Sequence, residues 1–482
     1  MKDPELEQMS AVSEMSDPAV SPSAAVPTTA PITAPITAPR PSNGLPSSVP
    51  YIIANEAAER FSFYGMSAIL MVYLSGSAYL AMPEKEAAGW IHLFRGSVYL
   101  FPLLGAFLAD IFFGKFRIMF WLSLVYCLGH LALALPDCSQ NFDPHTFLFI
   151  GLALIALGSG GIKSCTSAIV GDQFNAENQH LLNRVYHWFY LAINFGSFFS
   201  MLLTPWLLKH YGPGWAFGVP GILMACATLI LWLGRNKYRI VKPVGWKIFD
   251  DLKNRECLGS LGRISIVFGF LILFWAVYDQ TATTWVKQAE EMNAKIFASL
   301  TFLPENIRNF ELLPSQLQAL NPFLILILIP IFTYGIYPVW HRLWGHSTLK
   351  KIAVGLFLTV IAQCFPLAFA IAENHGIVLN LAWQVPAYFI LTTAVVLVSI
   401  TALDFAYTQS PRSMKSIVMG AFLLTTTCGN FFVAGVNFLC EKYEGFLSGS
   451  NYGLFFLILS LVNALFFLLV VRFYKEKTIL QD

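Results

Sequence analysis

Apolar stretches recur along the chain after residue 50, and each is close to the length that an α-helix needs to cross a bilayer, about 20 residues. A longer and mostly polar segment, 235–262, separates the sixth stretch from the seventh. The pattern predicts an all-α membrane protein with twelve transmembrane helices in two sets of six. We expect these helices at 51–74, 88–112, 118–136, 146–170, 186–208, 214–234, 264–284, 321–340, 350–372, 380–405, 416–438 and 452–472.

Two six-helix bundles joined by a long loop are the outline of a major facilitator transporter, although the number of helices alone leaves other twelve-helix folds open. The first 49 residues differ from the rest, because they are rich in Pro, Ala, Ser and Thr. We expect a disordered tail there. The predicted organisation is a cytoplasmic tail over 1–49, an N-terminal bundle over 50–234, a cytoplasmic loop over 235–262, a C-terminal bundle over 263–473 and a cytoplasmic tail over 474–482.

The composition agrees with a membrane protein. The chain is 56% hydrophobic and 12% charged, whereas soluble domains contain about 25% charged residues. The net charge is only +2 and the basic residues are spread over loops, so we expect no nucleic-acid partner. Loops on the side of both termini carry eighteen Lys and Arg residues, and the opposite loops carry six. The positive-inside rule then predicts cytoplasmic termini, in a plasma or inner membrane.

Three charged residues interrupt the first apolar stretch. Glu56, Glu59 and Arg60 are spaced i, i+3 and i+4, so a helix places all three on one face. A charge in hydrocarbon costs roughly 3 kcal/mol on insertion scales. The cluster is tolerable where it faces a polar interior and its members neutralise one another. It therefore indicates a pathway for an ion or a polar solute.

Few other ionisable residues lie at membrane depth in the predicted helices. A buried carboxylate stays charged while a cation pairs with it, and takes up a proton when that partner leaves. Proton coupling of this kind needs ion pairs between the bundles, for which the first bundle supplies Lys163 and the second supplies Asp279 and Arg263. Arg263 and Asp404 can equally be boundary residues that reach water, and an isolated His92 is more often a satisfied interior histidine. These further residues at membrane depth are His92, Arg95, Lys163, Arg263, Asp279 and Asp404.

Residues 56–65 read Glu-Ala-Ala-Glu-Arg-Phe-Ser-Phe-Tyr-Gly, which is similar to the ExxERFxYYG motif of the proton-coupled oligopeptide transporters, within the major facilitator superfamily. Five further segments resemble motifs of the same family in the same order. They are 160–163 with 171–174, 189–197, 274–280, 285–289 and 405–416. The resemblance covers essentially everything after residue 50 and implies the major facilitator fold.

The resemblance implies roles for individual residues. Lys163 would exchange partners with the acidic residues of the first helix, and Asp279 would take part in a salt bridge between the bundles that closes one gate. Arg263 matches the partner of this acidic residue in animal members. His92 stands eighteen residues before Asp110, which is the spacing of the proton-binding histidine in animal members. The implied proton-coupling residues are Glu56, Glu59, Arg60, His92, Lys163, Arg263 and Asp279. The implied substrate-binding residues are Tyr64, Lys163, Tyr190, Asn194 and Asn321.

The chain departs from the family at the anchors for the two ends of a peptide. The arginine that usually ends the first motif is Ser67 here. In the resembled family this arginine holds the peptide carboxylate together with the lysine that matches Lys163. The glutamate that usually meets the peptide amino end aligns with Val395, and the first tyrosine of the motif is Phe63. Losing a charge-assisted hydrogen bond costs roughly 1.5–3 kcal/mol, about tenfold or more in affinity.

We therefore expect a monomeric proton-coupled symporter that imports di- and tripeptides by alternating access. The close alternative is a proton-coupled transporter of another small anionic or zwitterionic solute, whose negative group Lys163 alone would hold. A signalling scaffold that binds solute without moving it is supported only by the 1–49 tail. An enzyme has no support, because there is no Ser/His/Asp set, HExxH motif or pair of loop acids. We also expect no metal or cofactor, with protons as the coupling ion.

Overall fold

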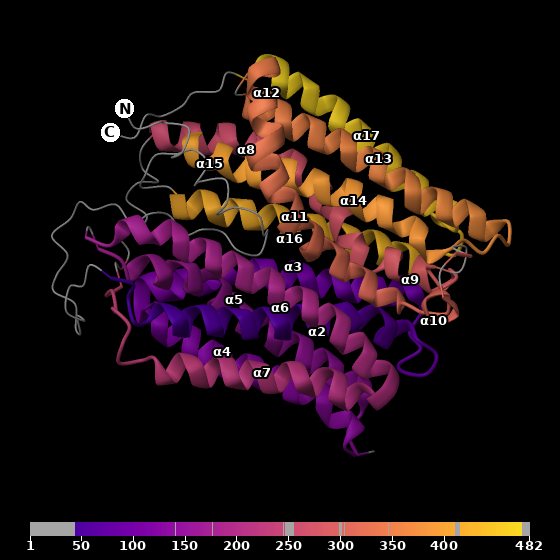
Figure 1. Cartoon of the computed structure of the whole chain (residues 1–482), viewed down its shortest axis with the longest axis horizontal. Helices are drawn as coiled ribbons and strands as arrows, with labels where there is room; N and C mark the ends of the chain where they lie inside the picture. Colours follow the sequence, from indigo (N-terminus) through magenta and orange to yellow (C-terminus); the bar gives the residue numbers. More distant parts are fainter. Residues whose placement is uncertain are drawn as a thin grey trace.

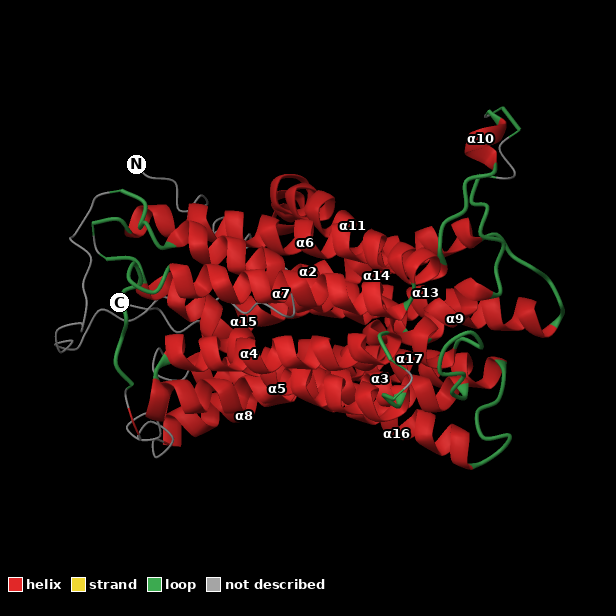
Figure 2. Ribbon diagram, turned by 90° about the horizontal axis from the view of Figure 1, so that it is seen from below, coloured by secondary structure: helices red, strands yellow, loops and turns green. Residues whose placement is uncertain are grey.

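The computed structural model describes residues 44–139, 141–175, 177–243, 245, 255–297, 301–302, 304–345, 347–409 and 415–474. The described chain consists of helices joined by loops, and Figure 2 shows no strand in it. The predicted tails, apart from 44–49 and 474, and residues 244 and 246–254 of the predicted loop lie outside the described residues.

Long helices make up the first half of the chain. Asp143 illustrates how the sequence sets their ends, because its carboxylate accepts the Thr146 backbone N–H at 2.8 Å and caps the helix that Pro144 begins. The Thr146 hydroxyl also donates to this carboxylate at 2.6 Å, and the hydroxyl and backbone bonds together lower the pKa of the Asp143 carboxyl. The helices are α2 (Val49–Ser75), α3 (Glu84–Leu108, continued by a π-helix over Ala109–Phe113), α4 (Lys115–Ala134), α5 (Pro144–Asp172), α6 (Leu182–Tyr211) and α7 (Pro213–Leu233).

The second half is more interrupted. A 3-10 turn over Asp279–Ala282 follows α8, and π-helices over Ile331–Ile336 and Val396–Ile400 join α11 to α12 and α14 to α15. Such irregular turns often mark functional hinges in helices. The helices are α8 (Arg255–Tyr278), α9 (Thr284–Glu290), α10 (Glu305–Arg308), α11 (Leu320–Pro330), α12 (Tyr337–Trp344), α13 (Thr348–Asn374), α14 (Gln384–Val395), α15 (Thr401–Gln409), α16 (Lys415–Lys442) and α17 (Ser450–Phe473).

The predicted all-α membrane fold is confirmed. Among the described residues, eleven helical spans are long and apolar enough to cross a membrane. The remaining predicted crossing is α2, which has 27 residues. This helix is not among the eleven apolar spans, because its charged triplet lowers its mean hydropathy. The structure differs at the predicted loop over 235–262, since α8 already begins at Arg255.

The helices are arranged in two groups that run side by side. In Figure 1, α2–α7, coloured indigo to magenta, lie below the long helices of α8–α17, coloured red to yellow, and α9 and α10 extend down beside them at the right. The groups meet where α3 packs on α16 and where α6 packs on α11. The end of the molecule that carries α9 and α10, at the right of Figure 1, is called the α9 end below.

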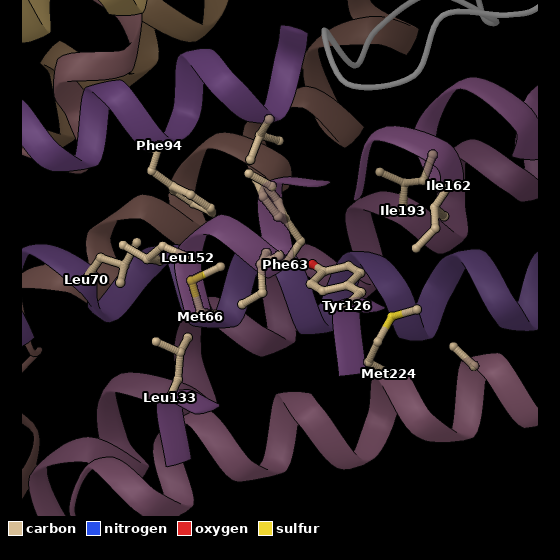
Figure 3. Close-up of a cluster of buried hydrophobic side chains, with 14 of the residues drawn as sticks. Phe63, Met66, Leu70, Phe94, Tyr126, Leu133, Leu152, Ile162, Ile193 and Met224 are labelled. Carbon is tan, nitrogen blue, oxygen red and sulfur yellow. The ribbon is translucent and has the colours of Figure 1, made fainter. Parts of the chain in front are cut away.

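Each group has its own apolar core. Figure 3 shows the core of the first group, where Phe63 and Met66 of α2 lie among side chains from α3 to α7. Glycines allow some of these helices to approach closely. A Cβ at Gly105 of α3 would lie 2.7 Å from the Gly160 carbonyl oxygen of α5. Only the missing side chain permits this backbone contact.

Contacts between the two groups include several toward the α9 end. Lys85, at the start of α3, lies with its Nζ 3.7 Å from the centre of the Tyr452 ring of α17. Trp90 packs edge-on against Phe438 of α16, with ring centres 5.4 Å apart. Gln318, just before α11, donates a hydrogen bond to the Ala68 carbonyl of α2 at 3.1 Å. These contacts hold the two groups together at this end.

Candidate functional site

The predicted charged triplet lies on one buried face of α2. Arg60 Nε donates a hydrogen bond to Glu56 Oε1 at 2.6 Å and lies 3.1 Å from Glu59 Oε2. No more than 1% of any of the three side chains is exposed. The triplet therefore faces the protein interior rather than lipid, as a charge in a membrane helix requires. With both carboxylates ionised, its charges sum to minus one.

Lys163 of α5 contacts α2 one turn beyond the triplet. Its Nζ lies 4.1 Å from the centre of the Phe63 ring and 4.6 Å from that of Tyr99 on α3, so the ammonium makes cation–π contacts with both rings. Phe63 follows Glu59 by four residues and therefore shares its face of α2. The structure thus brings Lys163 to the same face as the triplet, whose negative charge it would balance.

An ion pair joins the two helix groups. Arg95 of α3 donates a hydrogen bond from Nη1 to Asp279 Oδ1 at 2.6 Å. Asp279 is the first residue after α8. Both side chains are largely buried, with 11% of Arg95 and 6% of Asp279 exposed. The structure does not bring Arg263 to this carboxylate. Arg263 donates to Ser260 Oγ at 3.0 Å near the start of α8, and the helix between it and Asp279 is roughly 24 Å long.

His92 is fully buried one turn from Arg95 and belongs to the same network. Asn430 of α16 donates from Nδ2 to Asp279 Oδ2 at 2.6 Å and to the Thr426 carbonyl at 3.0 Å, so its Oδ1 is left to accept. His92 Nδ1, 2.9 Å from that Oδ1, must then carry a hydrogen. Its Nε2 lies 3.0 Å from Thr283 Oγ1.

The Thr283 hydroxyl can serve both forms of His92. When the ring is neutral, Thr283 donates its hydrogen to Nε2. When the ring is protonated, Nε2 donates to Thr283 Oγ1, and the hydroxyl hydrogen turns to the Gln280 carbonyl at 3.4 Å. A proton can therefore be held at His92 without moving a heavy atom.

A cavity lies between the two groups beside the ion pair. Its volume is about 70 Å³. One water needs roughly 10–15 Å³ of such a volume, so the cavity has room for several waters or a small polar solute. Its walls carry hydroxyl, amide and charged groups from both groups of helices. They are Phe63, Tyr64, Arg95, Tyr99, Asn194, Ser197, Met201, Tyr278, Asp279, Thr281, Gln318, Asn321, Pro322, Ile325 and Tyr388.

The predicted substrate residues are distributed around this cavity. Tyr64, Asn194 and Asn321 line it, and Asn321 also hydrogen-bonds the Tyr278 hydroxyl. Among the described residues, Lys163 and Tyr190 lie outside the lining. Lys163 contacts two residues of the lining, Phe63 and Tyr99. Tyr190 packs against the apolar core of the second group.

Sequence reasoning missed the uncharged members of the network. Asn430 and Thr283 occur in helical segments among other small polar residues, and nothing in the local pattern separates them. Arg95 was visible as a charge at membrane depth, three residues after His92, but its partner lies 184 positions away. Within the described residues, no group of three or more His, Cys, Asp or Glu side chains is arranged to hold a metal ion.

The two positions that anchor the ends of a peptide in the resembled family carry no charged side chain here, and neither faces the cavity. Ser67 is 2% exposed, Val395 is 1% exposed, and neither is among the described residues that line the cavity. Val395 instead belongs to the apolar core of the second group. The positions that carry arginine and glutamate in the resembled family therefore offer the cavity no charge here.

Comparison with known proteins agrees with the motifs. The family model described as PTR2, POT family, matches residues 116–258 and 253–447. A crystal structure of an auto-inhibited POT family peptide transporter superposes with a TM-score of 0.79 at 34% sequence identity, covering 91% of this chain and 99% of that one.

Two curated relatives show the same similarity. Solute carrier family 15 member 2 of Rattus norvegicus is 35% identical over 362 residues, which are 66% of this chain and 48% of that protein. Peptide transporter family 1 of Drosophila melanogaster is 36% identical over 357 residues, 66% of this chain and 46% of that protein. The chain spans about half the length of these relatives.

Proposed function

This chain belongs to the POT family, and from that premise we propose that it is a proton-coupled symporter that imports di- and tripeptides by alternating access. The observation that carries the proposal is the buried Arg95–Asp279 ion pair, which joins the two helix groups at the wall of a polar cavity. A bond that links two bundles and can exchange partners is what a rocking transporter needs. Relatives named peptide transporters support the choice of solute.

The proposal includes an orientation. Lysine and arginine gather in the loops at the end where α2 begins, so this end is cytoplasmic by the positive-inside rule. The α9 end is then external, in a plasma or inner membrane. The contacts of Lys85, Trp90 and Gln318 between the groups lie toward that external end. They support a state in which the external gate is closed.

The charged triplet would couple protons to this motion. Glu56, Glu59 and Arg60 carry one negative charge together, and Lys163 balances it. When the ammonium turns to an anionic solute, one carboxylate loses its compensation and takes up a proton, since an uncompensated charge is costly in the membrane interior. Release of the solute reverses both steps. Proton and solute therefore move together.

His92 would be the second proton site. Its hydrogen bonds accommodate both the neutral and the protonated ring, and Asn430 links it to Asp279. Protonation at His92 would place a second positive charge beside Arg95, which would repel Arg95 and compete with it for the negative charge of Asp279. A proton arriving from outside would in this way weaken the Arg95–Asp279 pair that closes the gate.

A second candidate solute class is favoured by one observation. Ser67 and Val395 are buried and give the cavity neither of the usual anchors for peptide termini. The alternative is therefore proton-coupled transport of another small anionic or zwitterionic solute. Peptides remain the first choice, because the relatives with peptide transporter in their names match over most of the described helices.

Uptake by purified protein in liposomes tests the proposal. With an inward proton gradient, radiolabelled dialanine should accumulate above its equilibrium level, and a proton ionophore should abolish the accumulation. Di- and tripeptides in excess should compete. Gradient-driven accumulation of another small anion with no competition by peptides would select the alternative, and no accumulation of either would reject both.

A further inference from the structure

His130 of α4 is a buried histidine that the coupling mechanism above does not use. Its side chain belongs to a residue that is 1% exposed, and its Nε2 lies 2.8 Å from Ser62 Oγ of α2. The ring of Tyr126, one turn earlier on α4, stacks on the imidazole with ring centres 5.2 Å apart. Gly221 of α7 packs closely against it, since a Cβ there would lie 2.9 Å from His130 Cβ. These contacts hold the imidazole in one orientation.

Ser62 and Tyr126 connect His130 to the charged triplet. Ser62 follows Glu59 by three residues, so the two share one face of α2. The Tyr126 hydroxyl is fully buried and interacts with Ser62 and, through charge, with Glu59. Neither oxygen of Glu59 accepts a hydrogen bond from a described residue, although Arg60 Nε lies 3.1 Å from one of them. Two hydroxyl groups therefore lie beside a buried carboxylate to which neither donates.

The imidazole of His130 sets the direction of the hydroxyl hydrogens. The Phe217 carbonyl of α7 also interacts with the ring, and because a carbonyl only accepts, we assign the hydrogen of the neutral imidazole to Nδ1. Nε2 then carries a lone pair and accepts the hydrogen of Ser62. The Ser62 oxygen is in turn the acceptor for the Tyr126 hydroxyl. Both hydrogens are thus directed toward His130 and away from Glu59.

We propose, resting on the proposed function, that His130 is a positioning residue that keeps hydroxyl donors away from Glu59. An ionised carboxylate without donors is poorly stabilised in the membrane interior, so it takes up a proton readily once Lys163 turns to the solute. Without an acceptor at His130, the Ser62 and Tyr126 hydroxyls turn round and donate to Glu59. The ionised form is then stabilised, and proton uptake needs a lower pH.

The helices around Glu59 and His130 add few titratable groups. Cys226 is the one titratable residue of α7 and is exposed. On α6, Gly196 meets this part of α2, and no titratable residue lies within one turn of it. The titratable and charged neighbours are Glu56, Arg60 and Tyr73 of α2, Tyr126 and Cys127 of α4 and Lys163 of α5. Replacing the neutral imidazole therefore changes the hydrogen bonds around Glu59 and leaves its charged neighbours in place.

The test compares variants of His130 that differ in their ability to accept a hydrogen. His130→Leu is apolar, whereas His130→Gln can accept the Ser62 hydrogen with its amide oxygen. H130L is also made in S62A/Y126F, in which neither hydroxyl is left to turn toward Glu59. One readout is the pH dependence of dialanine uptake into liposomes. The other needs no solute: the carboxyl C=O infrared band of Glu59, identified by its absence in E59Q, is followed in the purified protein as the pH is lowered.

We expect H130L to move the uptake profile and the infrared titration toward acid by about one to two pH units, the worth of one hydrogen bond to a charged group. H130Q should keep the wild-type profile, and H130L should cause no shift in the S62A/Y126F background. H130M replaces H130L where that protein is unstable. An unchanged titration in H130L, or an equal acid shift in H130Q or in the S62A/Y126F background, overturns the proposal.

Failure of the proposed function gives a different result. If the wild-type protein takes up no dialanine, the proposed solute is wrong, and the infrared titration still shows whether His130 controls the protonation of Glu59. If the wild type accumulates dialanine and H130L leaves the titration unchanged, the symporter stands and only the role of His130 is rejected.

Discussion

The ammonium of Lys163 lies 4.1 Å from the centre of the Phe63 ring, on the face of α2 that carries the charged triplet. The resembled motif has a tyrosine at this position, and a cation above a ring can be held by the face of either residue. Phe63 can offer only its face, because it has no hydroxyl. The face of the Phe63 ring therefore helps to hold the buried ammonium by cation–π attraction, together with the ring of Tyr99.

The first prediction concerns this ring. Phe63→Leu should weaken dialanine binding by about two- to thirtyfold, since a cation–π contact is worth roughly 0.5–2 kcal/mol, while Phe63→Tyr should stay close to wild type. Phe94→Leu is the matched control, because Phe94 is a buried neighbour whose ring centre lies 6.5 Å from that of Phe63. An equal loss of dialanine affinity in F63L and F94L would show that F63L weakens binding through lost packing and not through the cation–π contact.

The acidic pair gives the second prediction. Glu56→Gln or Glu59→Gln should abolish gradient-driven accumulation and leave some counterflow exchange, because solute still binds when the triplet can no longer take up a proton. Arg60 keeps a hydrogen-bond partner in both variants. The measurement is uptake with and without a proton gradient. Full accumulation in either variant would remove that carboxylate from the coupling step.

The third prediction separates the His92 network from ordinary buried hydrogen bonding. Asn430→Ala leaves Asp279 Oδ2 and His92 Nδ1 without their partner, so we expect the pH dependence of uptake to change. Asn437→Ala is the control on the same helix two turns later. Asn437 is also fully buried and donates to the Tyr452 hydroxyl at 3.1 Å, away from the ion pair.

Both asparagine variants should lose about 0.6–2 kcal/mol of stability, the range found for side-chain hydrogen bonds between membrane helices. Only N430A should move the pH profile. A shift of equal size in N437A would mean that loosened packing at α16, and not the proton network, sets the pH dependence.

Helix positions followed from the sequence because apolar length is a local property. The crossings were predicted to within a few residues, and the exception at Arg255 is a helix start embedded in polar residues, where length and hydropathy give no signal. The placement of the charged triplet on one helix face was equally predictable, because it follows from the spacing of the three residues alone. These features need no knowledge of what packs against the helix.

Partnerships across the molecule could not be predicted in this way. The sequence named Lys163 and Arg263 as cations near Asp279, and the resemblance favoured Arg263. The choice of Arg95 depends on how α3 is turned against α8, which no local pattern encodes. The role of Asn430 could not be predicted either. It is an uncharged amide among other polar residues of α16, and its spacing does not distinguish it from them.

Close packing of α3 on α5 yields the fourth prediction. In Gly105→Ala, the new Cβ would lie 2.7 Å from the Gly160 carbonyl oxygen, and backbone cannot yield cheaply. We expect a loss of about 1–3 kcal/mol in stability, measured as a lower melting temperature of the purified protein. Gly269→Ala in α8 is the control, because nothing lies within 4 Å of the Cβ it would add. Equal melting temperatures for both variants would contradict the tight crossing.

The fifth prediction concerns the missing anchor for a peptide amino group. Val395 is 1% exposed and packs within the apolar core of the second group, so a glutamate placed there would be buried without a cation instead of reaching the solute. Val395→Glu should therefore lower the melting temperature sharply and fail to raise dialanine affinity, alone or together with Ser67→Arg, because an unpaired buried charge costs several kcal/mol. Val395→Gln has the same shape without the charge and should be better tolerated. A stable V395E protein with higher affinity for dialanine than for N-acetyl-dialanine would contradict this prediction. It would show that α14 can turn position 395 toward the cavity, where a glutamate can bind the peptide amino group.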